Sequence, residues 1–183
     1  MLSKDYILGF VEGEGCFNIG VMLYTDAKPR KGTKRNKISK PAFPFRLKPS
    51  FRVVCVNRDR KVLEGIKETL GVGGIYLNNR KNPLHQTVAH YYVQSFADLL
   101  KVRDFFKDCE FQTVKGESFK NWCKCLEIMQ TNRQFTKEGF LEICKLREQM
   151  NIRESKNTMW RTEEVIKVLK NPGDHIIGSK HVE

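Results

Sequence analysis

Apolar residues change their spacing several times along the chain, and each change predicts a new helix or strand. The segment from Tyr6 to Gly15, YILGFVEGEG, is apolar over its first half and predicts a helix. Apolar and polar residues then alternate over 17–23 and again over 45–55, which predicts two strands of a hairpin. Helical spacing returns after Asn57, and the glycines within 71–74 predict the end of that helix.

The succession of two strands and one helix then occurs a second time. Alternation over 75–77 and 91–93, with a polar turn between them, predicts another hairpin, and Ser95 is placed to cap the next helix. The order helix, strand, strand, helix, strand, strand, helix predicts an α+β fold. We expect a four-stranded antiparallel sheet, shaped like a saddle, with helices over one face and the other face free.

Two further amphipathic helices are predicted after this unit, from Phe119 to Met129 and from Phe140 to Met150. Their apolar stripes are typical of core packing rather than of ligand binding. A chain of 183 residues is long enough for one domain, or one domain with a tail. We therefore expect a folded core over residues 1–150, followed over 151–183 by a basic C-terminal segment with a short helix and a tail.

The composition predicts a folded, basic domain. Hydrophobic residues make up 40% of the chain and charged residues 30%, which suits a chain with a real core. Lysine and arginine number 33 against 21 acids, and the formal charge of +12 favours a polyanionic partner such as nucleic acid or an anionic membrane. We expect no membrane association, because no segment is apolar enough to span a bilayer and the N-terminus lacks a signal-peptide pattern.

The six cysteines lie in apolar segments and lack the paired spacing that suits structural zinc. They are typical of reduced core thiols, and a domain of this size without a secretion signal does not call for a disulfide framework. We therefore expect an intracellular, reducing compartment; an organelle and an archaeal or bacterial cytoplasm are not distinguished. The four histidines are too dispersed to predict a metal cluster.

Positive charge is concentrated between Asp26 and Asp59, which enclose eleven lysines or arginines and no acid. Prolines and a glycine interrupt the first part of this stretch, which therefore predicts a long loop at the tip of the first hairpin. The alternative is a disordered basic arm. The basic residues of this loop are candidates for DNA binding, namely Lys28, Arg30, Lys31, Lys34, Arg35, Lys37 and Lys40.

The polar positions of the predicted strands are expected to share one cationic face. A two-stranded ribbon fits the major groove of DNA, where Arg and Lys donate to guanine and Asn pairs with adenine. A merely solvated face would usually mix charges of both signs, so we predict contact with nucleic acid. The candidates on the first hairpin are Asn18, Arg46, Lys48, Ser50 and Arg52, and those on the second are Tyr76, Asn78, Arg80, His90 and Tyr92. Lys156, in a hydroxyl-rich basic segment, is a candidate for phosphate contact.

The end of the first helix carries two acids between glycines, Glu12 and Glu14. A helix C-terminus is the negative pole of the macrodipole, so acids are unfavourable there and we expect a positive group to approach them. Gly9 and Gly13 share one face of the helix and would allow a second helix to approach closely. The alternative is an ordinary amphipathic helix with a solvated acidic end.

The segment from Ile7 to Gly15 resembles the signature of the LAGLIDADG homing endonucleases. The order of elements over roughly residues 4–150 is also similar to the core of one domain of that family. The resemblance implies that two signature helices pack side by side about a twofold axis. Only one signature is present, which implies a homodimer and a palindromic or near-palindromic target. The residues expected in the dimer interface are Ile7, Gly9, Phe10 and Gly13.

In that family the later acid of the signature binds a divalent metal at the scissile phosphates, which assigns metal binding to Glu14, with Gly13 beside it. The expected cofactor is Mg²⁺, with Mn²⁺ as a substitute. Asn57 matches the family's polar residue that orients water. Lys115, placed before a helix predicted to begin at Ser118, matches a lysine that stabilises charge on the phosphate. The alternative for Lys115 is a surface lysine.

The resemblance therefore implies a metal-dependent DNA endonuclease, a site-specific homing enzyme encoded in an intron. It would bind a long double-stranded target as a homodimer and hydrolyse one phosphodiester in each strand. One alternative keeps the fold without cutting DNA, as an intron RNA maturase or a DNA-binding regulator. Another is a basic structural RNA-binding module, which accounts for the charge but not for the GFVEGEG helix end. The sequence of the target is not predicted.

Overall fold

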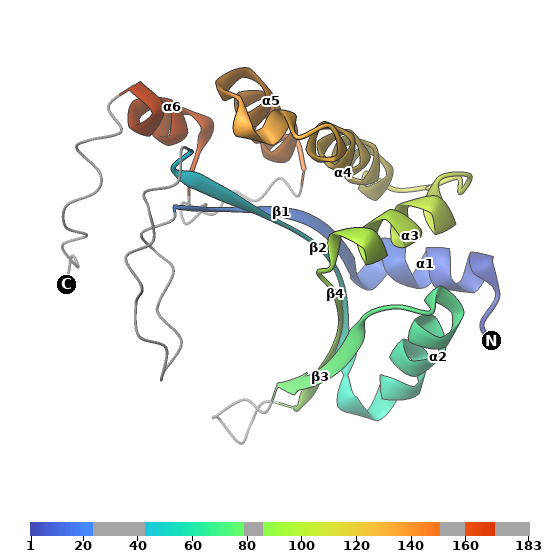
Figure 1. Cartoon of the computed structure of the whole chain (residues 1–183). Coiled ribbons are helices and arrows are strands. Elements are labelled where there is room, and N and C mark those ends of the chain that lie inside the picture. Colours follow the sequence, from blue (N-terminus) through green and yellow to red (C-terminus); the bar gives the residue numbers. More distant parts are fainter. Residues whose placement is uncertain (24–42, 79–85, 151–159, 171–183) are drawn as a thin grey trace.

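Four antiparallel strands form one curved sheet in the order β1-β2-β4-β3 (Figure 1). The structure is a computed structural model that describes residues 1–23, 43–78, 86–150 and 160–170. The strands are β1 (Gly15–Leu23), β2 (Phe45–Val56), β3 (Gly74–Asn78) and β4 (Val88–Val93). The predicted α+β fold with a four-stranded antiparallel sheet is confirmed.

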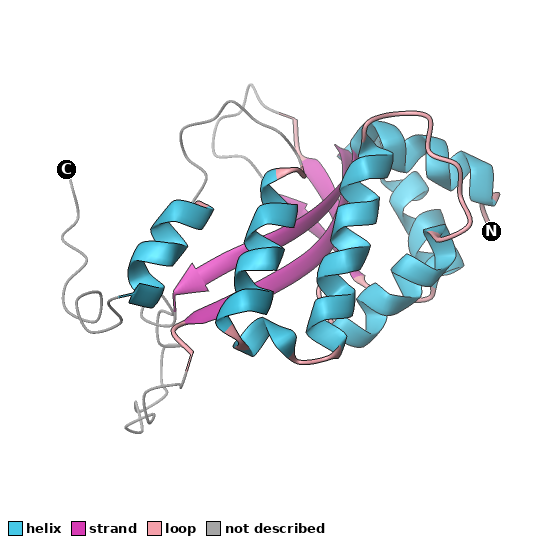
Figure 2. Ribbon diagram, turned by 90° about the horizontal axis from the view of Figure 1, so that it is seen from above, coloured by secondary structure: helices cyan, strands magenta, loops and turns pink. Residues whose placement is uncertain are grey.

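Six α-helices are described, and they lie on one side of the sheet (Figure 1). Seen from above, they cross over the strands and leave the opposite face of the sheet without a described helix (Figure 2). The order from α1 to α3 is the predicted one. The helices are α1 (Lys4–Glu14), α2 (Arg60–Leu70), α3 (Phe96–Phe106), α4 (Lys115–Gln130), α5 (Lys137–Glu148) and α6 (Thr162–Lys170), with short 3₁₀ turns η2 (Asn57–Asp59) and η3 (Arg133–Phe135).

Side-chain caps and glycines set several of the helix ends. The Ser3 hydroxyl accepts a hydrogen bond from the Tyr6 amide at 3.2 Å and begins α1. Gly71 ends α2 in the left-handed conformation, with φ of 67°, as the glycine pattern predicted. Ser95 occupies the cap position of α3, but its side chain makes no capping hydrogen bond. The prediction that α4 begins at Ser118 was also wrong, since α4 begins at Lys115.

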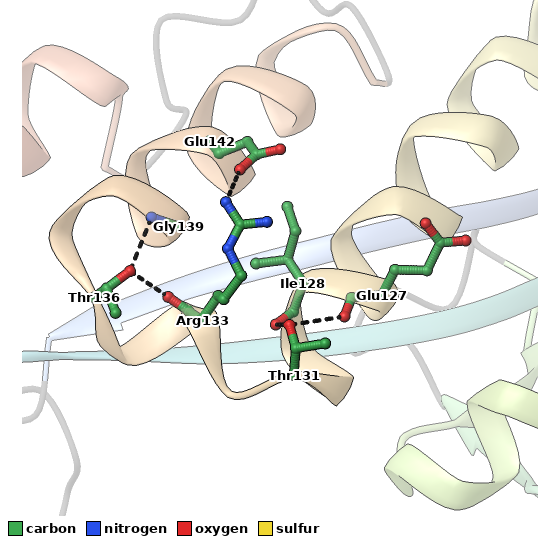
Figure 3. A network of polar contacts seen from close by, with 7 residues as sticks. All are labelled: Glu127, Ile128, Thr131, Arg133, Thr136, Gly139 and Glu142. Carbon is green, nitrogen blue, oxygen red and sulfur yellow. Dashed lines mark hydrogen bonds and ion pairs between the residues drawn. The ribbon is translucent and has the colours of Figure 1, made fainter.

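The turn between α4 and α5 is held by a network of polar contacts (Figure 3). The Thr136 hydroxyl donates to the Arg133 carbonyl at 2.8 Å and accepts from the Gly139 amide at 3.1 Å, so it caps α5. The Arg133 guanidinium pairs with the Glu142 carboxylate at 2.8 Å. A Cβ at position 139 would collide with the Arg133 carbonyl, so this close approach requires glycine.

The main core lies between the sheet and helices α1 to α5, and Phe17 is near its centre. This ring lies 5.0 to 6.2 Å, between centroids, from five others, a range in which aromatic rings attract one another. The five are Phe51, Phe106, Phe111, Phe119 and Trp122. The alternating apolar positions that predicted β1 and β2 therefore do face the helices.

A second group of buried apolar residues lies at the end of β1 and β2 that is farther from α1. We call it the distal cluster. Helix α6 contributes to it, so this helix of the predicted C-terminal segment packs against α5 and the strands; the division of the chain at residue 150 stays a prediction. The distal cluster consists of Val21, Leu23, Phe45, Phe140, Cys144, Val165 and Val168.

All six cysteines are free thiols in the structure. Burial raises the pKa of Cys123 and of Cys125 to about 12 and that of Cys144 to about 11, so these thiols stay protonated and unreactive near neutral pH. They are core residues, as their apolar surroundings in the sequence predicted. Within the described ranges, the helices are too short or too polar for any of them to cross a bilayer.

Candidate active site and nucleic-acid interface

The two acids of the signature segment lie in the last turn of α1, where the chain passes directly into β1 at Gly15. The Gly15 amide closes the helix by donating to the Val11 carbonyl. A Cβ at Gly15 would lie 2.6 Å from the Val11 carbonyl oxygen, so only glycine fits at this junction. The adjacent Glu14 is exposed at the end of the helix. The sequence thus places a solvent-accessible carboxylate at the point where helix and sheet meet.

The Glu12 carboxylate contacts a segment that is distant in the sequence. Its Oε1 atom accepts hydrogen bonds from the backbone amides of Gln112 and Thr113, both at 2.7 Å. These amides come just before α4, so one carboxylate joins the C-terminal end of α1 to the start of α4. This role of Glu12 was not predictable from the sequence, because the partners are about one hundred residues apart and no local pattern links them.

Lys115 supplies the positive group that the end of α1 was predicted to attract. It is the first residue of α4, and its Nζ donates to the carbonyl oxygens of Gly13, at 3.4 Å, and of Gly15. Burial lowers the pKa of Lys115, while the nearby Cys16, Glu14 and Glu12 act in the opposite direction. The structure therefore brings Lys115 into the electric field of Glu14 at the negative pole of the helix.

Asn57 begins the 3₁₀ turn η2, directly after β2, and its side chain is exposed. The backbone amide of Asn57 donates to the Thr87 carbonyl at 2.9 Å. Two residues earlier, burial raises the pKa of the Cys55 thiol, with smaller contributions from Asp59 and Glu14. The end of β2 is thus within range of the Glu14 charge. The sequence pattern indicated only a core position for Cys55. The water-orienting role of Asn57 stays a prediction.

The uncovered face of the sheet is cationic. Arg52 lies across from Cys16 on β1 and from Tyr92 on β4, while Lys48 lies across from Gly20 and Arg46 from Met22. All three basic side chains are exposed. None of the four described strands contains an aspartate or a glutamate, so the single sign of charge predicted for this face is present in the structure.

Polar and aromatic residues from the other strands share this face. Tyr76 is 61% exposed and lies across from His90, which is half-buried, as is Tyr92. Asn18 on β1 and Asn78 on β3 are exposed. Ser50 differs from the expectation: it lies opposite Asn18 on the same face but is only 5% exposed. Its short side chain lies between the longer chains of Lys48 and Arg52 on the same strand and is covered.

Several predicted DNA-binding residues lie outside the described residues. These are Lys28, Arg30, Lys31, Lys34, Arg35, Lys37 and Lys40 of the predicted loop, Arg80 of the second hairpin, and Lys156. Their contact with nucleic acid stays a prediction.

The outer face of α1 is open along its glycines. A Cβ added at Gly9 or at Gly13 would meet nothing within 4 Å. Beside them Tyr6 is 48% exposed and stacks on Phe10, with 6.4 Å between ring centroids. The prediction that Ile7 lies in a subunit interface disagrees with the structure, because its side chain is fully buried in the core of its own chain.

The donor atoms at the end of α1 would supply part of the coordination shell of a hard divalent cation. Glu14 offers an exposed carboxylate, whereas the Gly13 carbonyl accepts a hydrogen bond from Lys115. Among the described residues, no three His, Cys, Asp or Glu side chains come together as a metal site. Mg²⁺ typically takes one or two carboxylates and completes its shell with water and substrate phosphates. The residues fit such a shared site and do not form a complete one.

Comparison with known proteins agrees with this geometry. The family model described as LAGLIDADG endonuclease matches residues 7–126. The chain is 31% identical over 117 residues to the probable intron-encoded DNA endonuclease 1 of Mycosarcoma maydis, a match that covers 63% of this chain and 34% of that protein. The chain thus spans about a third of the length of this relative.

Two solved structures with the same fold match over nearly their whole length. The homing endonuclease I-TnaI is 27% identical with a TM-score of 0.68, and the match covers 92% of this chain and 97% of that one. The archaeal intron-encoded homing endonuclease I-Vdi141I, solved in complex with DNA, is 27% identical with a TM-score of 0.70 over 91% and 94% of the two chains. The family model covers well over half of the sequence, so this chain belongs to the LAGLIDADG endonuclease family.

Proposed function

We propose that this protein is a site-specific DNA endonuclease of the homing type, encoded in an intron, that hydrolyses one phosphodiester in each strand of its target. The observation that carries this proposal is the position of Lys115, whose ammonium donates to the carbonyls on either side of Glu14 at the end of α1, where the helix joins the sheet with the uncovered cationic face. A carboxylate beside an amine, next to a surface suited to phosphates, matches what phosphodiester hydrolysis requires.

The side chains at the end of α1 would divide the chemistry between them. Glu14 would hold a divalent cation, since its carboxylate is exposed and makes none of the contacts that engage Glu12. Mg²⁺, or Mn²⁺ in its place, would polarise the phosphate and lower the pKa of a bound water. Lys115 is held at the negative pole of α1 and places its ammonium where charge develops on the phosphate. Asn57 orients the attacking water.

DNA would lie along the uncovered face of the sheet. Arg46, Lys48 and Arg52 form a basic row along β2. Exposed Asn18 lies on the neighbouring strand β1, and exposed Tyr76 lies on β3, one strand beyond β4. A two-stranded ribbon fits the major groove, where arginine and lysine donate to guanine. The relative I-Vdi141I was solved with DNA bound, which supports double-stranded DNA as the partner.

A homodimer would bring two such sites to neighbouring phosphates. Gly9 and Gly13 leave the outer face of α1 open, so the backbone of a second α1 can approach closely. The two Glu14 carboxylates would then lie near the twofold axis, where bound cations offset their repulsion. Twofold symmetry in the protein implies a near-palindromic target.

Cleavage by the native chain and by Glu14→Gln tests the proposed chemistry. Both proteins are incubated with a library of randomised duplexes and Mg²⁺, and the cut ends are sequenced. We expect double-strand cuts at defined sites, lost with EDTA and in Glu14→Gln, and retained in the control Glu110→Gln, which changes an exposed acid before α4. Specific binding of duplex DNA without cutting by any of the three would instead indicate a regulator, and preferred binding of structured intron RNA would indicate a maturase.

The mass of the protein in solution tests the dimer. Gly9→Leu adds a side chain where the single chain has free space, so we expect it to fold normally but to sediment as a monomer. Ala97→Leu makes a similar addition at an exposed position of α3 and should leave the dimer intact. A native chain that sediments as a monomer at micromolar concentration, with and without DNA, would contradict the dimer.

A further inference from the structure

The distal cluster is separate from the main core and joins two strands to the last two helices. Val21 and Leu23 come from β1 and Phe45 from β2, and all three are at most 7% exposed. They pack with Phe140 and Cys144 of α5 and with Val165 and Val168 of α6. In Figure 1, α6 lies over the end of β1 and β2 that is remote from α1. This end of the sheet therefore has a hydrophobic cover of its own.

Aromatic rings make the closest contacts in this region. Phe45 stacks on Phe140, with 5.2 Å between centroids and 22° between ring planes. Trp160, which precedes α6, meets the Phe45 ring edge-on at 5.2 Å, and Phe43 lies 5.0 Å from Phe140. Such pairs stabilise more than their buried area alone. The start of β2 is thus enclosed by the ring of Phe140 on α5 and by the ring of Trp160.

Two hydrogen bonds attach the beginning of α6 to the end of α5. The Arg147 guanidinium donates to the Trp160 carbonyl at 2.8 Å, and the Glu148 carboxylate accepts from the Thr162 amide at 2.8 Å. Helix α5 is in turn attached to α4 by the turn network that Figure 3 shows. Contacts therefore continue from the main core through α4 and α5 to α6 and back to the strands.

The remote end of the sheet consists, among the described strands, of β1 and β2. Pairing between β2 and β4 begins at Phe51, so within the described part of the chain residues 45–50 of β2 pair with β1 alone. A two-stranded ribbon is at best marginally stable in water unless another element packs on it. This ribbon carries Arg46 and Lys48 on its uncovered face, while Phe45 and Val21 point into the distal cluster.

We propose that α5 and α6 act as a positioning clamp, which holds the two-stranded end of β1 and β2 in the shape that binds DNA and takes no part in the chemistry at Glu14. The proposal rests on the proposed DNA endonuclease function. Loss of the clamp should weaken DNA binding, because the ribbon with Arg46 and Lys48 would be ordered only at the moment of binding. The cleavage step in the bound complex should continue at its native rate, because the end of α1 is held by separate contacts.

Val165→Ser in the full chain tests the clamp, with Ile166→Ser as its control. Val165 is fully buried in the distal cluster, whereas Ile166 is a neighbouring half-buried residue of α6 outside it. Amide hydrogen exchange should become faster at 21–23 and 45–47 in Val165→Ser and stay at the native rate over α1. The dissociation constant for one fluorescent duplex, selected by the native chain from a randomised library, should rise about tenfold or more.

Cleavage at saturating duplex separates positioning from chemistry. We expect Val165→Ser to cut at about the native rate when all the protein is bound, so that KM rises and kcat does not. The clamp would be overturned if Val165→Ser had the same hydrogen exchange rates at 21–23 and 45–47, or the same DNA affinity, as Ile166→Ser. A lower cleavage rate of Val165→Ser at saturating duplex would also overturn it. Val168→Ala, a milder change in the same cluster, repeats the test should Val165→Ser fail to fold. A native chain without nuclease activity would refute the proposed function, and hydrogen exchange would still report on the clamp.

Discussion

Replacement of Glu12 by alanine should lower the stability of the protein and its cleavage rate and leave its affinity for DNA unchanged. The substitution removes the carboxylate that accepts from the Gln112 and Thr113 amides, both at 2.7 Å. These amides come immediately before α4, whose first residue is Lys115. Val114 makes no capping hydrogen bond, and the Thr113 hydroxyl accepts from the Lys115 amide at 3.3 Å. Glu12 therefore acts one step earlier, by holding the segment that carries Thr113 against the end of α1.

The magnitude follows from two charge-assisted hydrogen bonds in a solvent-exposed position. Bonds to charged groups contribute about 1.5–3 kcal/mol each when water is excluded, and an exposed helix cap contributes about 1 kcal/mol. Water can replace much of what Glu12→Ala removes, so we expect a loss of about 2 kcal/mol in the free energy of unfolding. For a chain of this size that corresponds to a fall in Tm of about 4–8 °C. A shift of Lys115 by about 1 Å would lower the cleavage rate by up to about 100-fold.

The assays are thermal unfolding, DNA binding and single-turnover cleavage of native, Glu12→Ala, Glu12→Gln and Glu110→Ala chains. Glutamine keeps the accepting oxygen and should retain most of the stability, whereas Glu110→Ala removes an exposed acid of the same segment and should change nothing. We expect Glu12→Ala to bind DNA as the native chain does and to cut it at least about tenfold more slowly. Equal Tm and equal cleavage rates for Glu12→Ala and Glu110→Ala would refute the reasoning.

Three further predictions concern other parts of the molecule. Lys48→Gln should weaken DNA binding and, because the proposed homodimer carries two copies of Lys48, reduce the slope of log K against log salt by about 2, whereas Lys61→Gln on α2, away from the uncovered face, should not; equal slopes in binding titrations would contradict the proposed interface. Burial lowers the pKa of Lys115, so this lysine loses its charge below the ordinary value of 10.5, and cleavage should decline with rising pH before that point. Arginine stays charged, so the residual cleavage activity of Lys115→Arg should show no such decline. Identical pH profiles of cleavage for the native chain and Lys115→Arg would exclude a role for the charge of Lys115. Tyr91→Phe removes the hydrogen bond from the tyrosine hydroxyl to the Val72 carbonyl at 2.8 Å and should lower stability by about 1–2 kcal/mol in urea unfolding, with DNA affinity unchanged.

The order of helices and strands was predictable because it depends on local spacing. Alternation with period two placed β1 and β2 correctly, since each apolar residue faces the helices wherever its neighbours lie. Gly71 marked the end of α2 because a left-handed backbone favours glycine. The single sign of charge on the uncovered face was predictable for the same reason, because alternation alone assigns Arg46, Lys48 and Arg52 to one side.

Predictions failed where a property depends on residues distant in the sequence. Ser50 lies on the predicted face, but the longer side chains around it decide that it is covered. Ile7 shares a helix with the open glycines, yet its direction into the core is set by the sheet below. Helix α4 begins at Lys115 rather than Ser118, and the segment before it is held by Glu12, about one hundred residues earlier, which no local pattern reveals.

The two ends of β1 are held by separate sets of contacts, and this separation suits the proposed endonuclease, which would recognise DNA over a long surface and cut it at one point. At Gly15 the strand meets α1, where Lys115 and Glu12 connect it to α4 by hydrogen bonds that fix atoms closely. At Leu23, about 26 Å away by strand geometry, the contacts are apolar and aromatic and support a surface rather than single atoms. Chemistry depends on the placement of a few polar atoms, and affinity on a row of side chains, so each end has the kind of contact that its task requires.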